Sequence, residues 1–214
     1  PIQATILNGD IETGVSIIKM TEKVDAGPIL SNSKFKIQNS KLTYKELHDE
    51  LAELGANLLI KTIPDWIEGK IKAKPQDESK ATYTKIIKKE DGRIDWGKEA
   101  EQIYNQFRAY YEWPGIWTHS TSSQQASSGQ AHSTSSGQAN KILKITDCKI
   151  LESQPYHSHD EYYIGRVYQE NGMIYIPCGK GHIEILRVQQ EGKKDMTISE
   201  FLRGHPNFVG SVLE

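Results

Sequence analysis

The chain has 214 residues and a formal net charge of −2 at pH 7, and it is 36% hydrophobic and 25% charged. This composition is typical of a folded globular protein and excludes collagen-like and strongly charged unfolded chains. No apolar run reaches the roughly 18 residues that a membrane-spanning helix requires, and no signal-like segment opens the chain. The two cysteines, Cys148 and Cys178, form no CxxC pair. We therefore expect buried free thiols, a cytoplasmic location and no metal site.

The first 69 residues have the pattern of an α/β domain. Residues 1–8 have the character of a helix end, which Gly9 closes. Residues 14–20 and 27–37 have the apolar and β-branched composition of strands. The first of these strands is apolar enough to predict burial on both faces, as in a parallel sheet.

A long amphipathic helix follows the two strands. Thr43 and Glu46 have the spacing of a capping box, and apolar residues then recur at helical spacing. We expect Pro64 to bend or restart this helix and Gly69 to end it. The predicted apolar stripe consists of Leu47, Leu51, Leu54 and Leu58.

Residues 70–82 predict a basic linker. They are polar, contain Pro75 and open a region, from Lys70 to Lys98, with nine Lys or Arg residues against five Asp or Glu residues. A basic connector in an acidic chain can hold a polyanion near a site. Lysines on a solvated linker need no such function, so composition leaves both interpretations open.

Residues 83–214 predict a small β-barrel with one helix. Asp95 is the candidate N-cap of that helix. After Lys141 the pattern changes to short strands at close spacing, and Asn171-Gly172 has the sequence of a type I′ hairpin turn. This pattern is typical of a closed or partly open barrel. Four aromatic residues beside the helix are expected to pack in the core rather than to stack on bases: Tyr110, Tyr111, Trp113 and Trp117.

Two polar segments carry no predicted site. Residues 119–140 form a Ser- and Gln-rich repeat with no apolar residue larger than alanine, so we expect a disordered loop. The segment HSHDE, residues 157–161, places two histidines beside two carboxylates. No further ligand has a suitable spacing, and we expect a solvated loop there rather than a metal site.

Two sets of motifs resemble a known family. The stretch PIQATILNGDIETGVSIIKM, followed by DAG, resembles the folate-dependent formyltransferases. The stretches ATYTKIIKKEDGRIDWGKEAEQIYNQFRAYYEWPGIWT and ILRVQQEGKKDMTISEFLRG are similar to the C-terminal barrel of those members that act on methionyl-tRNA. The resemblance covers nearly all of the chain except the repeat. It implies an α/β part followed by a β-barrel: the C-terminal part of a Rossmann-like formyltransferase domain (1–69), the linker (70–82) and an OB-like barrel (83–214).

The resemblance also implies a reaction, the transfer of a formyl group from 10-formyltetrahydrofolate to the amino group of initiator methionyl-tRNA. Attack of the amine on the formyl carbon creates an oxyanion, and the attacking nitrogen must lose a proton. The family's catalytic aspartate corresponds to Asp25, whose carboxylate would orient a histidine, and Val24, Asp25 and Gly27 would contact the folate. The family's Asn-x-His and Ser-Leu-Leu-Pro motifs would lie before Pro1. We therefore expect a truncated chain that is inactive by itself.

The resemblance places the tRNA on the linker and the barrel. The chain would act as a monomer with tRNA and folate as partners and no membrane. Two alternatives are a related formyltransferase acting on a sugar nucleotide and a non-catalytic tRNA-binding module. Lysines that would contact tRNA phosphates are Lys70, Lys72, Lys74, Lys80, Lys85, Lys88, Lys89, Lys193 and Lys194.

Overall fold

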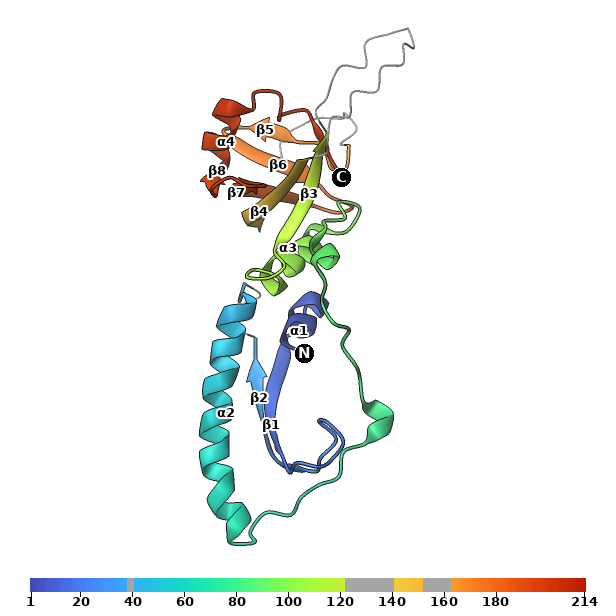
Figure 1. Ribbon diagram of the computed structural model, residues 1–214, viewed down its shortest axis with the longest axis vertical. Coiled ribbons are helices and arrows are strands. Elements are labelled where there is room, and N and C mark those ends of the chain that lie inside the picture. The colour runs from blue at the N-terminus through green and yellow to red at the C-terminus, as the bar shows by residue number, and fades with distance from the viewer. Residues whose placement is uncertain (38–40, 122–140, 152–162) are drawn as a thin grey trace. The chain divides into compact units, whose positions relative to one another are not determined.

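The computed structural model describes residues 1–37, 41–121, 141–151 and 163–214. The chain divides into two units, Pro1–Ile86 and Ile87–Glu214 (Figure 1). Within the described ranges, every helix is too short or too polar to cross a membrane.

The N-terminal unit combines a two-stranded sheet with two helices. Helix α1 (Ile2–Asn8) ends at Gly9, which has a left-handed backbone, as the sequence predicts. Strands β1 (Glu12–Ile18) and β2 (Ile29–Lys36) pair in antiparallel register, and helix α2 (Tyr44–Ile67) packs against both.

The prediction that the first strand is buried on both faces in a parallel sheet is wrong. Strand β1 pairs antiparallel with β2, and its residues alternate between exposed and half-buried. Val15 lies on the half-buried face, next to Gly55 of α2. A β-branched composition favours a strand without determining what covers its faces.

Helix α2 begins as predicted. The Thr43 hydroxyl accepts from the Glu46 backbone N–H, and the Glu46 carboxylate accepts from the Thr43 backbone N–H at 2.8 Å, which completes the capping box. The helix continues through Pro64 to Ile67, and Gly69 follows with a positive φ of 72°.

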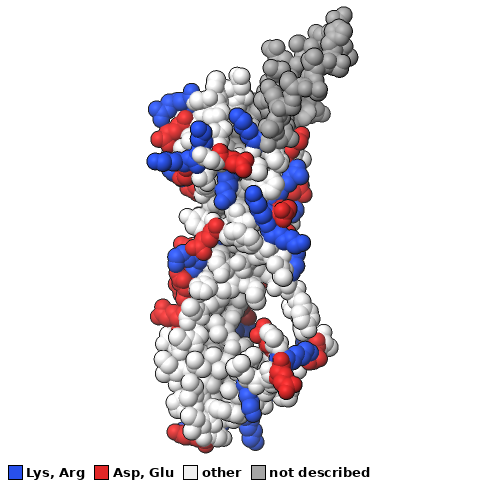
Figure 2. All heavy atoms as spheres, in the orientation of Figure 1, with Lys and Arg blue, Asp and Glu red and all other residues white. Residues whose placement is uncertain are grey.

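One face of α2 packs in the unit and another is exposed and apolar. Leu47 and Leu51 are buried. Toward the C-terminal end, a second set of large apolar side chains is exposed, and Figure 2 shows a mostly uncharged surface where Figure 1 places this helix. We call this set the α2 stripe; it consists of Leu59, Ile60, Ile63, Trp66 and Ile67.

The C-terminal unit is built on an antiparallel sheet with the strand order β5-β6-β7-β4-β3-β9, and β8 pairs with β7. Helix α3 (Ala100–Ala109) packs on β4 and β7, and α4 (Ile198–Gly204) packs on β7 and β8. The strands are β3 (Ile116–Thr121), β4 (Lys141–Ile150), β5 (Tyr168–Glu170), β6 (Met173–Pro177), β7 (His182–Gln190), β8 (Met196–Thr197) and β9 (Val212–Leu213). Two short 3₁₀ turns, η1 (Glu78–Lys80) and η2 (Lys89–Gly92), lie before α3 in the chain.

The described residues do not form a closed barrel. Strand β9 pairs with β3 on one side. On the other side, it meets the residues before β5 through an isolated bridge, Arg166–Val212, and the flanking hydrogen bonds. Besides the helix expected before the strands, the unit contains a second, short α-helix, α4, which begins at the capping box of Thr197 and Glu200.

Other local predictions have mixed outcomes. Asn171 and Gly172 both have positive φ and connect β5 to β6, as a type I′ turn requires. The prediction of Asp95 as N-cap is wrong, because its carboxylate accepts from the Gly97 N–H instead and α3 begins after Glu99. The predicted loop over 119–140 begins too early, since His119–Thr121 belong to β3. The rest of that repeat and residues 157–161 lie outside the described residues.

Candidate functional site

Asp25 lies in the loop that connects β1 to β2. The Lys19 N–H donates to the Pro28 carbonyl at 3.0 Å and closes the base of this loop. Asp25 has a left-handed backbone with a φ of 55° and is exposed. Across the described residues, its carboxylate has no hydrogen bond or ion pair. An exposed carboxylate on a loop of fixed shape is available to a ligand.

Gly27 determines the shape of that loop. A Cβ atom at this position would lie 1.8 Å from the Lys19 carbonyl oxygen, so only glycine fits. Gly27 is buried, whereas Val24 is 84% exposed. Among the predicted folate contacts, Val24 and Asp25 are therefore at the surface, and Gly27 supports the backbone beneath them. Contact with folate stays a prediction for all three.

Residues 74–78 of the linker hold this loop. Lys74 and Ile29 exchange two backbone hydrogen bonds, at 2.8 and 2.9 Å. The Gln76 side-chain amide donates to the carbonyls of Asp25 at 2.8 Å and Gly27 at 2.6 Å. Lys23 forms an exposed ion pair with Glu78 at 2.6 Å. We call these contacts the loop clamp. The polar sequence of the linker gave no signal for it, because the partners are about 50 residues apart in the chain.

The predicted tRNA-binding lysines differ in their partners. Lys70 forms ion pairs with Glu68 and Asp65, and Lys80 pairs with Asp77. Lys72 and Lys74 are exposed, and the described part of the chain offers neither ammonium group an ion pair. The lysines are divided between the two units. Lys70, Lys72, Lys74, Lys80 and Lys85 belong to the N-terminal unit, and Lys88, Lys89, Lys193 and Lys194 belong to the C-terminal unit.

Two aromatic side chains expected in the core are exposed. Tyr110 is buried and Trp117 half-buried, but Tyr111 is 51% and Trp113 is 57% exposed. The core prediction is therefore wrong for Tyr111 and Trp113, because both lie in the turn between the end of α3 at Tyr110 and the start of β3 at Ile116. Pro114-Gly115 marks the turn in the sequence, but a turn signal does not show which of the side chains beside it are exposed.

Lysines lie close to this aromatic turn. The Trp117 indole N–H donates to the Lys89 carbonyl at 3.1 Å. The Lys144 side chain extends over Gly115, where a Cβ atom would lie 2.7 Å from Lys144 Cε. Nearby acids, Glu90 and Glu112, are also exposed, and Figure 2 shows cationic and anionic groups interspersed over the C-terminal unit. We name the aromatic shelf by its residues: Tyr111, Trp113, Lys88, Lys89 and Lys144.

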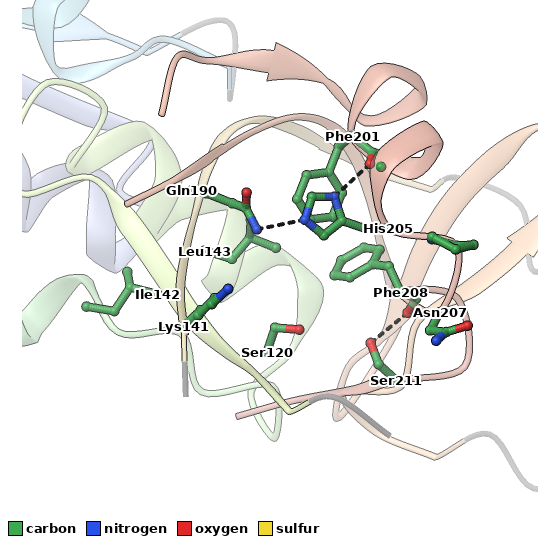
Figure 3. Close-up of a pocket in the computed structure, with 12 residues that line it drawn as sticks. Ser120, Lys141, Ile142, Leu143, Gln190, Phe201, His205, Asn207, Phe208 and Ser211 are labelled. Atoms are coloured by element: carbon green, nitrogen blue, oxygen red, sulfur yellow. Dashed lines mark hydrogen bonds between the residues drawn. The ribbon is translucent and has the colours of Figure 1, made fainter. Parts of the chain in front are cut away.

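A cavity of about 450 Å³ lies in the C-terminal unit beside α4 (Figure 3). The His205 ring stacks on Phe201 at 4.1 Å between centroids, and its Nδ1 donates to the Phe201 carbonyl at 2.9 Å. Its Nε2 accepts from the Gln190 amide at 3.0 Å. Both ring nitrogens are thus engaged, so His205 is held in one tautomer and is not positioned as a free acid or base. Within the described residues, no group of three His, Cys, Asp or Glu side chains could hold a metal ion.

Comparison with the models of known protein families identifies the class of protein to which this chain belongs. The model of the formyl transferase C-terminal domain matches residues 86–206, and the formyl transferase model matches residues 1–63. The chain therefore belongs to the formyl transferase family.

The relatives in sequence are more specific. The methionyl-tRNA formyltransferase of Rickettsia bellii is 36% identical over 206 residues, which cover 95% of this chain and 58% of the relative. The methionyl-tRNA formyltransferase of Bacillus velezensis is 36% identical over 215 residues, which cover 100% of this chain and 60% of the relative. The chain thus spans less than two thirds of the length of these relatives.

Solved structures share the fold at low identity. HypX from Aquifex aeolicus, in complex with tetrahydrofolic acid, has a TM-score of 0.64 and 14% identity, covering 97% of this chain and 33% of that chain. An N-formyltransferase from Helicobacter canadensis, in complex with folinic acid and dTDP-3-aminofucose, has a TM-score of 0.58 and 19% identity, covering 88% of this chain and 60% of that chain. At these identities the similarity shows the fold alone.

Proposed function

We propose that the chain is part of an enzyme that transfers a formyl group from 10-formyltetrahydrofolate to the amino group of initiator methionyl-tRNA in the cytoplasm. The observation that carries this proposal is the 36% identity to methionyl-tRNA formyltransferases across both units. The open sheet of the C-terminal unit would be the OB-like barrel of such an enzyme.

The reaction requires a bond exchange at the formyl carbon. The methionyl nitrogen bonds to that carbon and loses a proton, the bond from the carbon to folate N10 breaks, and N10 gains a proton as tetrahydrofolate leaves. Asp25 is our candidate catalytic residue, because its exposed carboxylate can orient a hydrogen-bond donor or accept a proton next to the reacting atoms. Val24, 84% exposed beside it, offers an apolar contact for the folate ring system.

The tRNA would be held by lysines that have no ion pair within the part of the chain that the structure describes. Lys74 belongs to the loop clamp through its backbone, Lys72 precedes it, and Lys88 and Lys89 lie in the aromatic shelf. Lysines position RNA through its phosphates without reading bases. The exposed rings of Tyr111 and Trp113 add surfaces on which unpaired bases can stack. Lys70, Lys80 and Lys85 each have an interaction within the chain, so we assign them a smaller share of the binding.

A sugar-nucleotide formyltransferase is the second candidate. Its support is the shared fold with the Helicobacter canadensis enzyme, whose complex contains dTDP-3-aminofucose. The distribution of the lysines over both units favours the tRNA acceptor, because a sugar nucleotide has too few phosphates to engage so many lysines.

The test is filter binding of initiator methionyl-tRNA to the 214-residue chain, with dTDP-3-aminofucose as competitor, and formyl transfer to both acceptors measured in the enzyme of which we propose the chain to be part. We expect salt-sensitive tRNA binding that the sugar nucleotide does not displace. Any formyl transfer should disappear in Asp25→Asn, which retains shape and loses the carboxylate charge. Displacement of tRNA by micromolar sugar nucleotide would favour the second candidate. Tight tRNA binding with transfer unaffected by Asp25→Asn would remove Asp25 from the mechanism.

A further inference from the structure

The Asp25 loop has few hydrogen bonds of its own. Between the closing bond of Lys19 with Pro28 and the tip, the Thr21 hydroxyl donates to the Lys23 carbonyl at 3.0 Å, and the Ala26 N–H reaches the same carbonyl only at 3.5 Å. Asp25 also occupies a left-handed conformation that L-residues adopt at a cost. A loop with this backbone needs support from outside itself.

Gln76 supplies that support from the linker. Its side-chain NH₂ group has two hydrogens, and it donates one to the Asp25 carbonyl and one to the Gly27 carbonyl. Only the nitrogen of the amide can donate, so the two carbonyl partners determine the orientation of the side chain. The Asp25 carbonyl is bonded to the Cα atom that carries the carboxylate side chain, so a hydrogen bond to this carbonyl restrains the backbone from which the side chain extends.

The backbone next to Gln76 is itself fixed. Two hydrogen bonds between Lys74 and Ile29 attach the linker to the start of β2. Pro75 restricts its own φ and keeps Lys74 extended, so Gln76 is presented at one position. The ion pair of Lys23 and Glu78 is exposed on both sides and contributes little by comparison.

We propose that Gln76 is a positioning residue for Asp25. We also propose that the loop clamp couples the linker to the candidate catalytic loop, so that restraining one restrains the other. This inference rests on the proposed function for the role of Asp25 and for tRNA as the ligand of Lys72 and Lys74. An RNA phosphate bound at these lysines restrains the residues that hold the loop. Binding of the acceptor thereby orders the carboxylate that acts on it.

Hydrogen–deuterium exchange of the 214-residue chain tests the clamp without requiring activity. The variants are Gln76→Glu, which removes both donors, and Gln76→Asn, which keeps the amide but shortens its reach. Gln169→Glu, at an exposed position of β5, is the matched control for the added charge. We expect exchange in a peptide spanning residues 19–30 to rise roughly tenfold or more in both Gln76 variants, since two hydrogen bonds are lost, and not in the control.

The pH dependence separates a donor role from simple packing. A protonated glutamic acid can donate one hydrogen bond, so Gln76→Glu should regain part of the protection as the pH falls toward about 4. Gln76→Asn should not, and it also controls for the titration of Asp25, Asp77 and Glu78. Initiator methionyl-tRNA should slow exchange of the same peptide in the wild type and in Gln169→Glu, but less in the Gln76 variants.

The outcomes distinguish the clamp from the proposed function. Unchanged exchange in both Gln76 variants overturns the clamp, whether or not tRNA binds. Faster exchange that low pH does not reverse in Gln76→Glu overturns the donor role of Gln76. Faster exchange with pH reversal, in a chain that binds no tRNA, upholds the clamp and counts against the proposed function alone.

Discussion

Gly27 lies directly against the backbone of Lys19, the residue that follows β1. A methyl group there would meet the Lys19 carbonyl oxygen at 1.8 Å, and because this neighbour is backbone rather than a flexible side chain, it leaves little room to relax. We expect Gly27→Ala to destabilise the loop by about 2–3 kcal/mol, as overpacking against backbone does. Faster tryptic cleavage after Lys23 is the readout. Gly204→Ala is the matched control, because its Cβ atom would meet nothing within 4 Å, and cleavage at the wild-type rate in Gly27→Ala would contradict the prediction.

The two cysteines predict how stability depends on alkaline pH. Both thiols are free and buried, as the sequence predicts, and burial raises the pKa of both, to about 12 for Cys178. A thiol whose pKa is higher in the folded chain stabilises the fold fully below its unfolded pKa, near 9.0, and this contribution is lost as the pH rises toward 12.

We therefore expect the urea midpoint to fall above pH 9, and to fall less in Cys178→Ser, whose hydroxyl does not ionise in this range. At pH 8, a thiol-reactive dye should label the native chain slowly and both cysteines rapidly in denaturant. Rapid labelling of the native chain would show that a thiol is accessible and that the alkaline effect has another origin.

At the scale of elements, α2 has two faces with different surroundings. Leu47 and Leu51 are buried, whereas the α2 stripe is exposed, with Ile60 at 70% and Ile67 at 77%. A two-stranded sheet under one helix covers only part of an amphipathic helix of this length. Contiguous exposed apolar side chains of this kind bind hydrophobic surfaces and dyes.

Removing the stripe should therefore reduce dye binding. We expect Ile60→Lys with Ile67→Lys to lower anilinonaphthalene sulfonate fluorescence by roughly half while the helix content by circular dichroism stays the same. Ala56→Lys with Asn57→Lys adds the same charge to exposed positions of the same helix and should leave the signal unchanged. If both double variants lowered the fluorescence equally, the added charge, and not the loss of the α2 stripe, would explain the reduced dye binding.

At the scale of the whole molecule, the sequence predicts elements better than their surroundings. Helix α1, the capping box at Thr43 and the turn at Asn171 follow from local geometry that a few adjacent residues determine. The antiparallel pairing of β1 with β2 and the exposure of Trp113 depend on how the chain turns after a strand or helix ends, which the composition of these elements does not encode.

The candidate site shows the same division. Asp25 is found by family resemblance, but Gln76 is not, because its role arises only when the linker returns to the start of β2. The resemblance assigns the lysines to tRNA without distinguishing among them, and ion pairs that the sequence does not specify separate Lys70 and Lys80 from Lys72 and Lys74.

The distribution of lysines over two units predicts how tRNA binding responds to salt. Each lysine that contacts a phosphate releases a counterion, so Lys88→Gln with Lys89→Gln should reduce the slope of log K against log salt by about 1 per residue. Trp113→Ala should weaken binding roughly 5- to 100-fold and leave the slope unchanged, because base stacking releases no counterions. Lys45→Gln, whose ammonium pairs with Asp49 on α2, is the control and should change neither quantity.

Filter binding of initiator methionyl-tRNA across a range of salt concentrations measures both quantities in one series. If Lys45→Gln reduced the slope of log K against log salt equally, tRNA binding would depend on the net charge of the chain and not on contacts with Lys88 and Lys89. Full affinity in Trp113→Ala would mean that the exposed ring does not touch the RNA. A reduced slope for the paired lysines, together with a constant slope for Trp113→Ala, would place phosphate and base on adjacent parts of the aromatic shelf, because η2, which begins at Lys89, packs against the turn that carries Trp113.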